Sequence, residues 1–142
     1  MKRNSRLSLA LHTLSHMAND PARTRTSADI AAHAGTNPVV VRRVFGKLRE
    51  AGILSSEKGH AGGWRLARPS EGITLADVYL ALDERLVVGN TTRIETTDCS
   101  VETDLRRCVS DVLEEVELTL VDRLRETSIN DIHSASCSYC AD

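Results

Sequence analysis

The residues of this chain that could carry chemistry fall into two sets, a basic run in the first half and four cysteines in the second. The basic run lies in NPVVVRRVFGKLREAG, residues 37–52. Arginine can bond bidentately to guanine, asparagine can bond to adenine, and valine can contact the methyl group of thymine. Lysine and arginine also bind phosphates, which position a protein on a nucleic acid without reading its sequence. The run therefore predicts contact with DNA.

The distribution of charge along the chain favours the same interpretation. The formal net charge of all 142 residues is -2. Residues 1–72 hold 12 Lys and Arg against 5 Asp and Glu, a charge of +7, whereas residues 73–142 hold 6 against 15, a charge of -9. Such asymmetry indicates a polyanion partner for the first half. The alternative is two solvated faces of one ordinary domain.

The cysteines are Cys99, Cys108, Cys137 and Cys140, and they leave three interpretations open. We favour a thiol switch at Cys99, because a loop cysteine near a helix N-terminus favours the reactive thiolate and can form a disulfide with Cys108 or another subunit. A second interpretation is a metal or iron–sulfur site that recruits Cys99 and Cys108 with a tail cysteine or another ligand. The third is inert thiols, with Cys108 buried as a small apolar side chain.

Helical patterns indicate the elements that position the basic run. SRLSLALHTLSHMA places four apolar residues on one helical face, and TSADIAAHAG has a capping-box spacing from Thr26 to Asp29 and a glycine C-cap at Gly35. After a turn of two residues, a further helix begins at Pro38. Its predicted core face is Val41, Val44, Phe45 and Leu48, and its outer face carries Val39, Arg42, Arg43, Gly46 and Glu50. This order of elements is typical of a helix-turn-helix.

Two strands predicted around Ile53–Glu57 and Trp64–Ala67 flank the turn-rich KGHAGG and form a wing. Of the five histidines, only His60 is expected beside DNA. His12, His16 and His33 are expected to have structural roles on helix surfaces or seams, and His133 could join a metal site in the tail. The candidate DNA contacts are Thr26, Ser27, Asn37, Val39, Val40, Arg42, Arg43, Lys47, Lys58, Gly59 and His60.

The acidic half contains a second capping box from Thr74 to Asp77, a loop, and a long helix predicted from Val101 to Thr127. A last turn and a tail follow. The apolar stripe of the long helix predicts a two-fold dimer contact, and the alternative is that it packs within its own chain. The stripe consists of Leu105, Val109, Val112, Val116, Leu120 and Leu124.

The motifs SRLSLALHTLSHMA, TNPVVVRRVFGKLREAGIL, KGHAGGWRLAR and ITLADVYLAL together resemble the Rrf2 family of bacterial winged-helix regulators, over nearly the whole chain to about Ile132. The resemblance implies a homodimer that crosses long helices and binds a palindromic operator, with Arg42 reading bases and residues 58–60 contacting the minor groove or phosphates. Cluster-binding members carry three cysteines before the long helix. This chain has only Cys99 and Cys108 there, so it looks closer to the cluster-free branch.

We therefore expect a mainly α fold with a small β-hairpin, divided into a winged helix-turn-helix domain (1–85), a sensor loop (86–100), a dimerisation helix (101–132) and a cysteine-containing tail (133–142). The expected function is a dimeric DNA-binding repressor with a cysteine switch and no enzymatic activity. No apolar run is long enough to cross a membrane, so the expected location is cytoplasmic. The alternatives are a cluster- or metal-sensing regulator of the same fold, a thiol oxidoreductase using the CxxC of Cys137 and Cys140, and a protein-interaction module.

Overall fold

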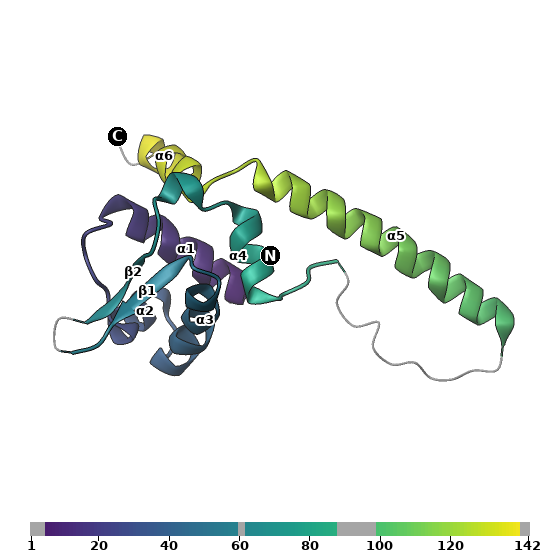
Figure 1. Ribbon diagram of the computed structural model, residues 1–142, viewed down its shortest axis with the longest axis horizontal. Coiled ribbons are helices and arrows are strands. Elements are labelled where there is room, and N and C mark those ends of the chain that lie inside the picture. The colour runs from purple at the N-terminus through teal and green to yellow at the C-terminus, as the bar shows by residue number, and fades with distance from the viewer. Residues whose placement is uncertain (1–4, 60–61, 88–98, 140–142) are drawn as a thin grey trace.

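The helices and the hairpin form a body from which one long helix extends (Figure 1). This computed structural model describes residues 5–59, 62–87 and 99–139, with side chains described as far as residue 135. In chain order the elements are α1 (Arg6–Asn19), α2 (Ser27–Ala34), α3 (Pro38–Glu50), β1 (Leu54–Glu57), β2 (Gly63–Leu66), the short 3-10 helix η1 (Ser70–Gly72), α4 (Leu75–Leu82), α5 (Ser100–Arg125) and α6 (Ile129–Tyr139). Among the described residues, no helix has the length and apolarity to span a membrane.

The helix boundaries follow from local capping chemistry, as the sequence predicted. The Thr26 side chain accepts a hydrogen bond from the Asp29 amide at 3.1 Å, and the Asp29 carboxylate accepts one from the Thr26 amide at 3.3 Å. The same reciprocal pair joins Thr74 and Asp77 at the start of α4. Both predicted capping boxes are therefore confirmed.

The core lies where α1, α3 and α4 meet the base of the hairpin. The predicted inner face of α3 is confirmed, because Val41, Val44, Phe45 and Leu48 are all buried. The two strands are antiparallel, with Leu54 opposite Leu66 and Glu57 opposite Gly63. The hairpin thus continues directly from the buried end of α3, so α3 and the wing share one rigid base.

The end of the chain differs from the sequence prediction of a long helix followed by a last turn. The long helix ends at Arg125, and a separate helix, α6, packs against α1. Its start is fixed by Ser128, whose side chain accepts from the Asp131 amide at 3.1 Å, and by Ile129, which is fully buried and donates to the Ile73 carbonyl at 2.8 Å. Residues 129–132 therefore belong to the body and not to the long helix.

Candidate nucleic-acid interface

The turn between α2 and α3 is set by a glycine in the left-handed region. Gly35 has φ +66°, and its amide and that of Thr36 both donate to the Ala31 carbonyl, which closes the end of α2. A residue with a Cβ is strained at this φ, whereas glycine is not. The predicted C-cap is confirmed, and it directs the chain into α3 with only Thr36 and Asn37 between the helices.

Asn37 is the N-cap of α3. Its Oδ1 accepts hydrogen bonds from the amides of Val39 at 3.0 Å and Val40 at 3.1 Å. Bidentate recognition of adenine needs that same oxygen as an acceptor for the base. The fold therefore already uses the atom that the predicted base contact requires, and Asn37 serves here to start the helix.

The outer face of α3 carries exposed side chains at Val39, Arg42 and Arg43, with Val39 56% exposed. No carboxylate of the described residues forms an ion pair with either arginine, although six other arginines are paired in this way. A Cβ added at Gly46 would meet no atom within 4 Å, so this position is also open to the outside. The outer face of α3 therefore presents two guanidinium groups without a carboxylate partner among the described residues, next to an open position at Gly46.

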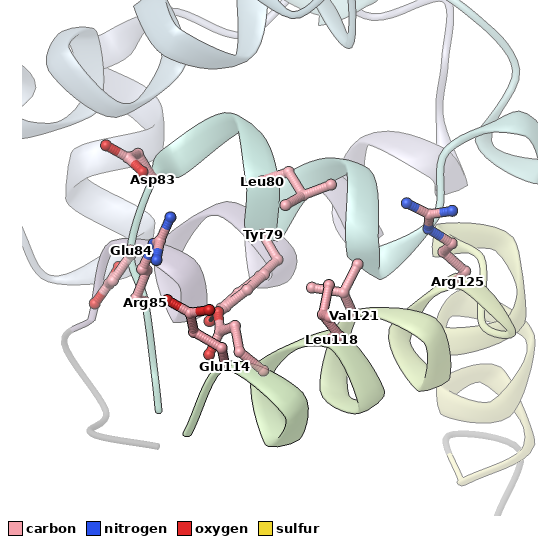
Figure 2. Close-up of a pocket in the computed structure, with 10 residues that line it drawn as sticks. Tyr79, Leu80, Asp83, Glu84, Arg85, Glu114, Leu118, Val121 and Arg125 are labelled. Atoms are coloured by element: carbon pink, nitrogen blue, oxygen red, sulfur yellow. Dashed lines mark hydrogen bonds between the residues drawn. The ribbon is translucent and has the colours of Figure 1, made fainter. Parts of the chain in front are cut away.

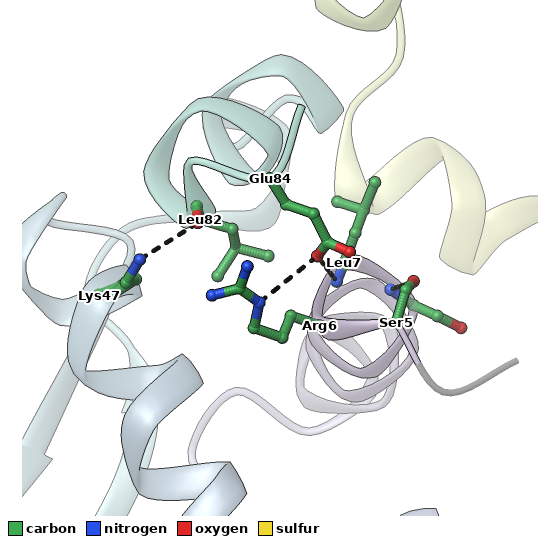
Figure 3. Close-up of polar contacts among 7 residues, drawn as sticks. Ser5, Arg6, Leu7, Lys47, Leu82 and Glu84 are labelled. Carbon is green, nitrogen blue, oxygen red and sulfur yellow. Dashed lines mark hydrogen bonds and ion pairs between the residues drawn. The ribbon is translucent and has the colours of Figure 1, made fainter. Parts of the chain in front are cut away.

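Lys47 lies on the side of α3 that faces α4. Its ammonium donates to the Leu82 carbonyl at 3.3 Å, at the last turn of α4 (Figure 3). In the same view the Glu84 carboxylate accepts from the Leu7 amide at 3.1 Å and pairs with Arg6 at 3.8 Å. Lys47 thus satisfies a helix-terminal carbonyl, which is a structural role beside the phosphate contact predicted for it.

Trp64 joins the wing to both helices of the helix-turn-helix. Its indole N–H donates to the Ser27 hydroxyl of α2 at 2.9 Å, and its ring meets Phe45 of α3 edge-to-face with centroids 5.5 Å apart. The Arg49 guanidinium lies 5.9 Å above the same ring. Trp64 also pairs its backbone with Arg25, just before α2. These contacts fix the direction of the wing relative to α3.

The remaining predicted contacts belong to the wing and to the start of α2. Lys58 and Gly59 are exposed beyond β1, whereas His60 lies outside the described residues. The Thr26 hydroxyl is bonded to Asp29, and the Ser27 hydroxyl accepts from Trp64, so both side chains have structural partners. The Thr26 amide is also engaged, because it donates to the Asp29 carboxylate at 3.3 Å, so of these two residues only the Ser27 amide would remain for a phosphate.

The two described cysteines are both exposed, which is contrary to the interpretation in which Cys108 is buried. Cys99 is the N-cap of α5 and Cys108 lies within it. They are nine helical steps apart, which separates them by about 13 Å along the axis. A disulfide needs Cα atoms within about 7 Å, and two thiolates on one zinc ion lie within about 5 Å. In this fold, Cys99 and Cys108 of one chain cannot form a disulfide or share an ion.

The separation of Cys99 and Cys108 along α5 also matters for an iron–sulfur cluster, which needs its cysteine ligands close together. Cys137 has no described side chain and Cys140 lies outside the described residues. The described thiols therefore do not assemble a cluster-binding set.

Among the described residues, the long helix contacts the body through its C-terminal half, from about Glu114 onward (Figure 1). Four of the six predicted stripe residues are about half exposed or more, between 47% and 62%, and Leu120 and Leu124 pack against the core. The interpretation that the stripe packs entirely within its own chain is therefore wrong for the described residues. The four exposed members are Leu105, Val109, Val112 and Val116.

A cavity of about 430 Å³ lies between α4 and α5, lined on one side by Tyr79 and Leu80 and on the other by Glu114, Leu118 and Val121 (Figure 2). The Tyr79 hydroxyl donates to the Glu117 carboxylate and accepts from the Leu86 amide at 2.8 Å. Burial raises the pKa of Tyr79, and the bond to Glu117 acts in the same direction. These bonds tie α5 to α4 and to the segment that follows α4.

A side-chain cluster that the sequence analysis did not predict joins α1 and α2. His12 and His16 of α1 and His33 of α2 place one ring nitrogen each within 4.8 Å of one another. The i, i+4 spacing of the first two was a signal, because it puts both rings on one helical face. Nothing in the sequence showed that the last turn of α2 would bring His33 to them.

Comparison with known proteins agrees with this architecture. The family model Rrf2, described as iron-dependent transcriptional regulator, matches residues 3–135. YwnA of Bacillus subtilis, whose name places it among HTH-type transcriptional regulators, is 32% identical over 91% of this chain and 95% of its own length. The HTH-type transcriptional regulator IscR of Vibrio cholerae is 32% identical over 61% of this chain, which spans only 47% of that protein.

Among solved structures, one titled as a DNA-binding protein superposes with a TM-score of 0.73 at 30% identity, covering 90% of this chain and 98% of its own. The family and these relatives are transcriptional regulators and not enzymes. The helix-turn-helix, the wing and the long C-terminal helix of this structure are the elements that such a regulator requires. This chain belongs to the Rrf2 family of winged helix-turn-helix transcriptional regulators.

Proposed function

We propose that the protein binds a specific DNA operator as a homodimer and represses transcription. The observation that carries the proposal is the outer face of α3, where Arg42 and Arg43 are exposed and have no carboxylate partner among the described residues. Val39 adds an apolar group on the same face that suits a thymine methyl. The wing, held by Trp64, supplies Lys58 for a phosphate.

The exposed stripe of α5 supports the homodimer. A soluble protein rarely leaves a continuous apolar stripe of this length in water, and a second copy of α5 offers the same surface. Pairing of two identical helices would relate the two α3 helices by a two-fold axis. The operator of such a dimer is palindromic, because its half-sites follow the symmetry of the protein.

The test of DNA recognition starts with duplexes selected from a random library by the unaltered protein. In a gel-shift titration, Arg42→Ala combined with Arg43→Ala should lose the preference for the selected duplex over a scrambled one, because each bidentate base contact contributes about 1–3 kcal/mol of discrimination. The matched control removes the same charge far from α3, by Arg123→Ala with Arg125→Ala. Undiminished preference in the α3 variant would contradict the proposal.

The proposed signal is oxidation or alkylation of Cys99, which is exposed at the N-terminus of α5. Because Cys108 of the same chain is out of reach, the partner of an oxidised Cys99 would be a cysteine of the second subunit or a small thiol. Non-reducing mass spectrometry after peroxide treatment distinguishes these products. As a regulator of chromosomal DNA in bacteria, the protein would act in the cytoplasm.

A further inference from the structure

The three-histidine cluster lies on two helices that are both packed in the hydrophobic core. His12 and His16 lie one turn apart on α1, and His33 lies in the last turn of α2. Buried residues next to them in the chain, among them Leu14 and Met17 of α1, anchor α1 in the core. The rings project outward and all three histidines are exposed, so a solute reaches them directly.

The ring positions approach those around a single metal ion. The Nε2 atoms of His16 and His33 are 3.3 Å apart, and the ring centroids are separated by 4.7 Å for His12 and His16, 5.4 Å for His12 and His33, and 4.7 Å for His16 and His33. Zinc–nitrogen bonds of about 2.0–2.1 Å at tetrahedral angles place two ligand nitrogens about 3.4 Å apart. One pair already has this spacing. All three ligand nitrogens lie within 4.8 Å of one another, so rotation of the exposed rings would have to close the remaining gap to the third.

The charges around His16, which include Arg25, favour the neutral form of its ring, the form that binds a metal. No carboxylate of the described residues forms an ion pair with any of the three rings. Partial burial lowers the pKa of His16, and the neighbouring His12 and His33 lower it further. The neutral, metal-binding form of His16 therefore persists to lower pH than that of an isolated histidine.

We propose that His12, His16 and His33 form a binding site for one divalent transition-metal ion of the class that prefers imidazole, represented by Zn²⁺. An all-nitrogen donor set excludes Mg²⁺ and Ca²⁺, which require oxygen ligands. Three protein ligands leave the fourth tetrahedral position to water. The site lies on α1 and α2, away from the two described cysteines, Cys99 and Cys108, of the long helix (Figure 1).

Occupancy of this site would cross-link α1 to the end of α2. A neighbouring hollow of about 460 Å³ is lined by His12 and His33 together with Gly35, Thr36 and Val40, so the site adjoins the turn that leads into α3. A bound ion therefore restrains the helix-turn-helix at its turn. The consequence is a rise in thermal stability that depends on metal concentration.

The test uses the full chain with all four cysteines replaced by serine, titrated with ZnCl₂ against a chromogenic chelator. We expect one Zn²⁺ per chain, and at least a tenfold loss of affinity in His33→Gln and in His12→Gln. The matched control, His60→Gln, should bind as the parent does. Equal affinity in parent and His33→Gln, or no binding by the parent at 100-fold molar excess over protein (about 1 mM), would overturn the proposal.

A second measurement avoids dependence on the cysteine-free variant. Unaltered protein loaded with one equivalent of Co²⁺ should show the visible d–d absorption of a tetrahedral site without the near-ultraviolet charge-transfer band that thiolate ligands produce. The d–d absorption should disappear in His16→Gln. A strong thiolate band at one equivalent would place the ion on cysteine and refute the histidine site.

Discussion

Substitution of Asn37 can separate a structural role on α3 from a role in reading a base. Its Oδ1 accepts from two backbone amides, at 3.0 and 3.1 Å, which are among the donors left unpaired at a helix start. Removal of such a cap costs about 1 kcal/mol, within a range of roughly 0.5–2. For a chain of this size, that loss lowers the unfolding temperature by roughly 3–4 °C. Asn37→Ala should show this decrease.

Asn37→Ser is the decisive companion variant, because a serine hydroxyl still caps the helix but cannot bond bidentately to adenine. We expect its unfolding temperature, followed by circular dichroism, to stay close to that of the parent. We also expect its preference for the selected duplex over a scrambled one to change by less than threefold. A tenfold loss of preference in Asn37→Ser, with unchanged stability, would show that Asn37 reads a base and would refute the capping argument. Unchanged stability in Asn37→Ala would also refute the capping argument, because the cap would then contribute nothing to the fold.

Three further predictions concern the wing, the long helix and the contact between α4 and α5. Ser27→Ala removes the acceptor for the indole of Trp64 and should lower the free energy of unfolding, measured in urea, by about 1 kcal/mol. Trp64→Phe should lower this free energy less in the Ser27→Ala background than in the parent, because the same bond is already lost. Val109→Asp places a charge on the exposed stripe and should shift sedimentation from dimer to monomer without loss of helicity; a dimer that persisted would contradict the pairing of α5. The Tyr79 hydroxyl has a raised pKa, so its contribution to stability is complete below pH 10 and is lost as the pH rises through the folded-state pKa. The unfolding midpoint of the parent should therefore fall relative to Tyr79→Phe as the pH rises above 10, and a constant difference would contradict the assigned bond to Glu117.

The sequence was sufficient for elements whose boundaries depend on nearby residues. Thr26 and Asp29 are three positions apart, Gly35 supplies its own left-handed turn, and Val41, Val44 and Phe45 recur at helical spacing. These are properties of a single turn or helix, so periodicity and capping rules apply to them directly. The outer face of α3 was predictable for the same reason, since it is the complement of the inner face.

Features that depend on distant residues were not predictable in this way. The Ser128 cap was present in the sequence, but α6 is stable because Ile129 fills the core beside Ile73, 56 positions earlier. Trp64 could be placed on a strand, yet its bond to Ser27 depends on how the hairpin folds back over α2. The base contact at Asn37 stays a prediction, and the sequence analysis made it without the cap bonds to the unpaired amides at the helix start, which the structure adds.

The geometry of α5 restricts how the proposed signal at Cys99 could reach the proposed DNA contacts on α3. Glu117, which holds Tyr79 of α4, lies 18 helical residues from Cys99, or about 27 Å along the axis. Modification of the thiol can therefore affect the body of its own chain through α5 only if the whole helix moves as a rigid unit. Two routes remain: displacement of the α5 helices in the proposed dimer, or displacement of Val87, whose amide donates to Glu117 at 3.3 Å. Both routes end at α4, and α4 is bonded to α3 through the Lys47 ammonium and the Leu82 carbonyl.

Lys47→Met should therefore weaken the response of DNA affinity to thiol oxidation more than it weakens DNA affinity itself, as gel-shift titrations of reduced and oxidised protein would measure. If Lys47→Met lowered the affinity of both forms equally, the lysine would be a phosphate contact and α4 would not transmit the signal through it.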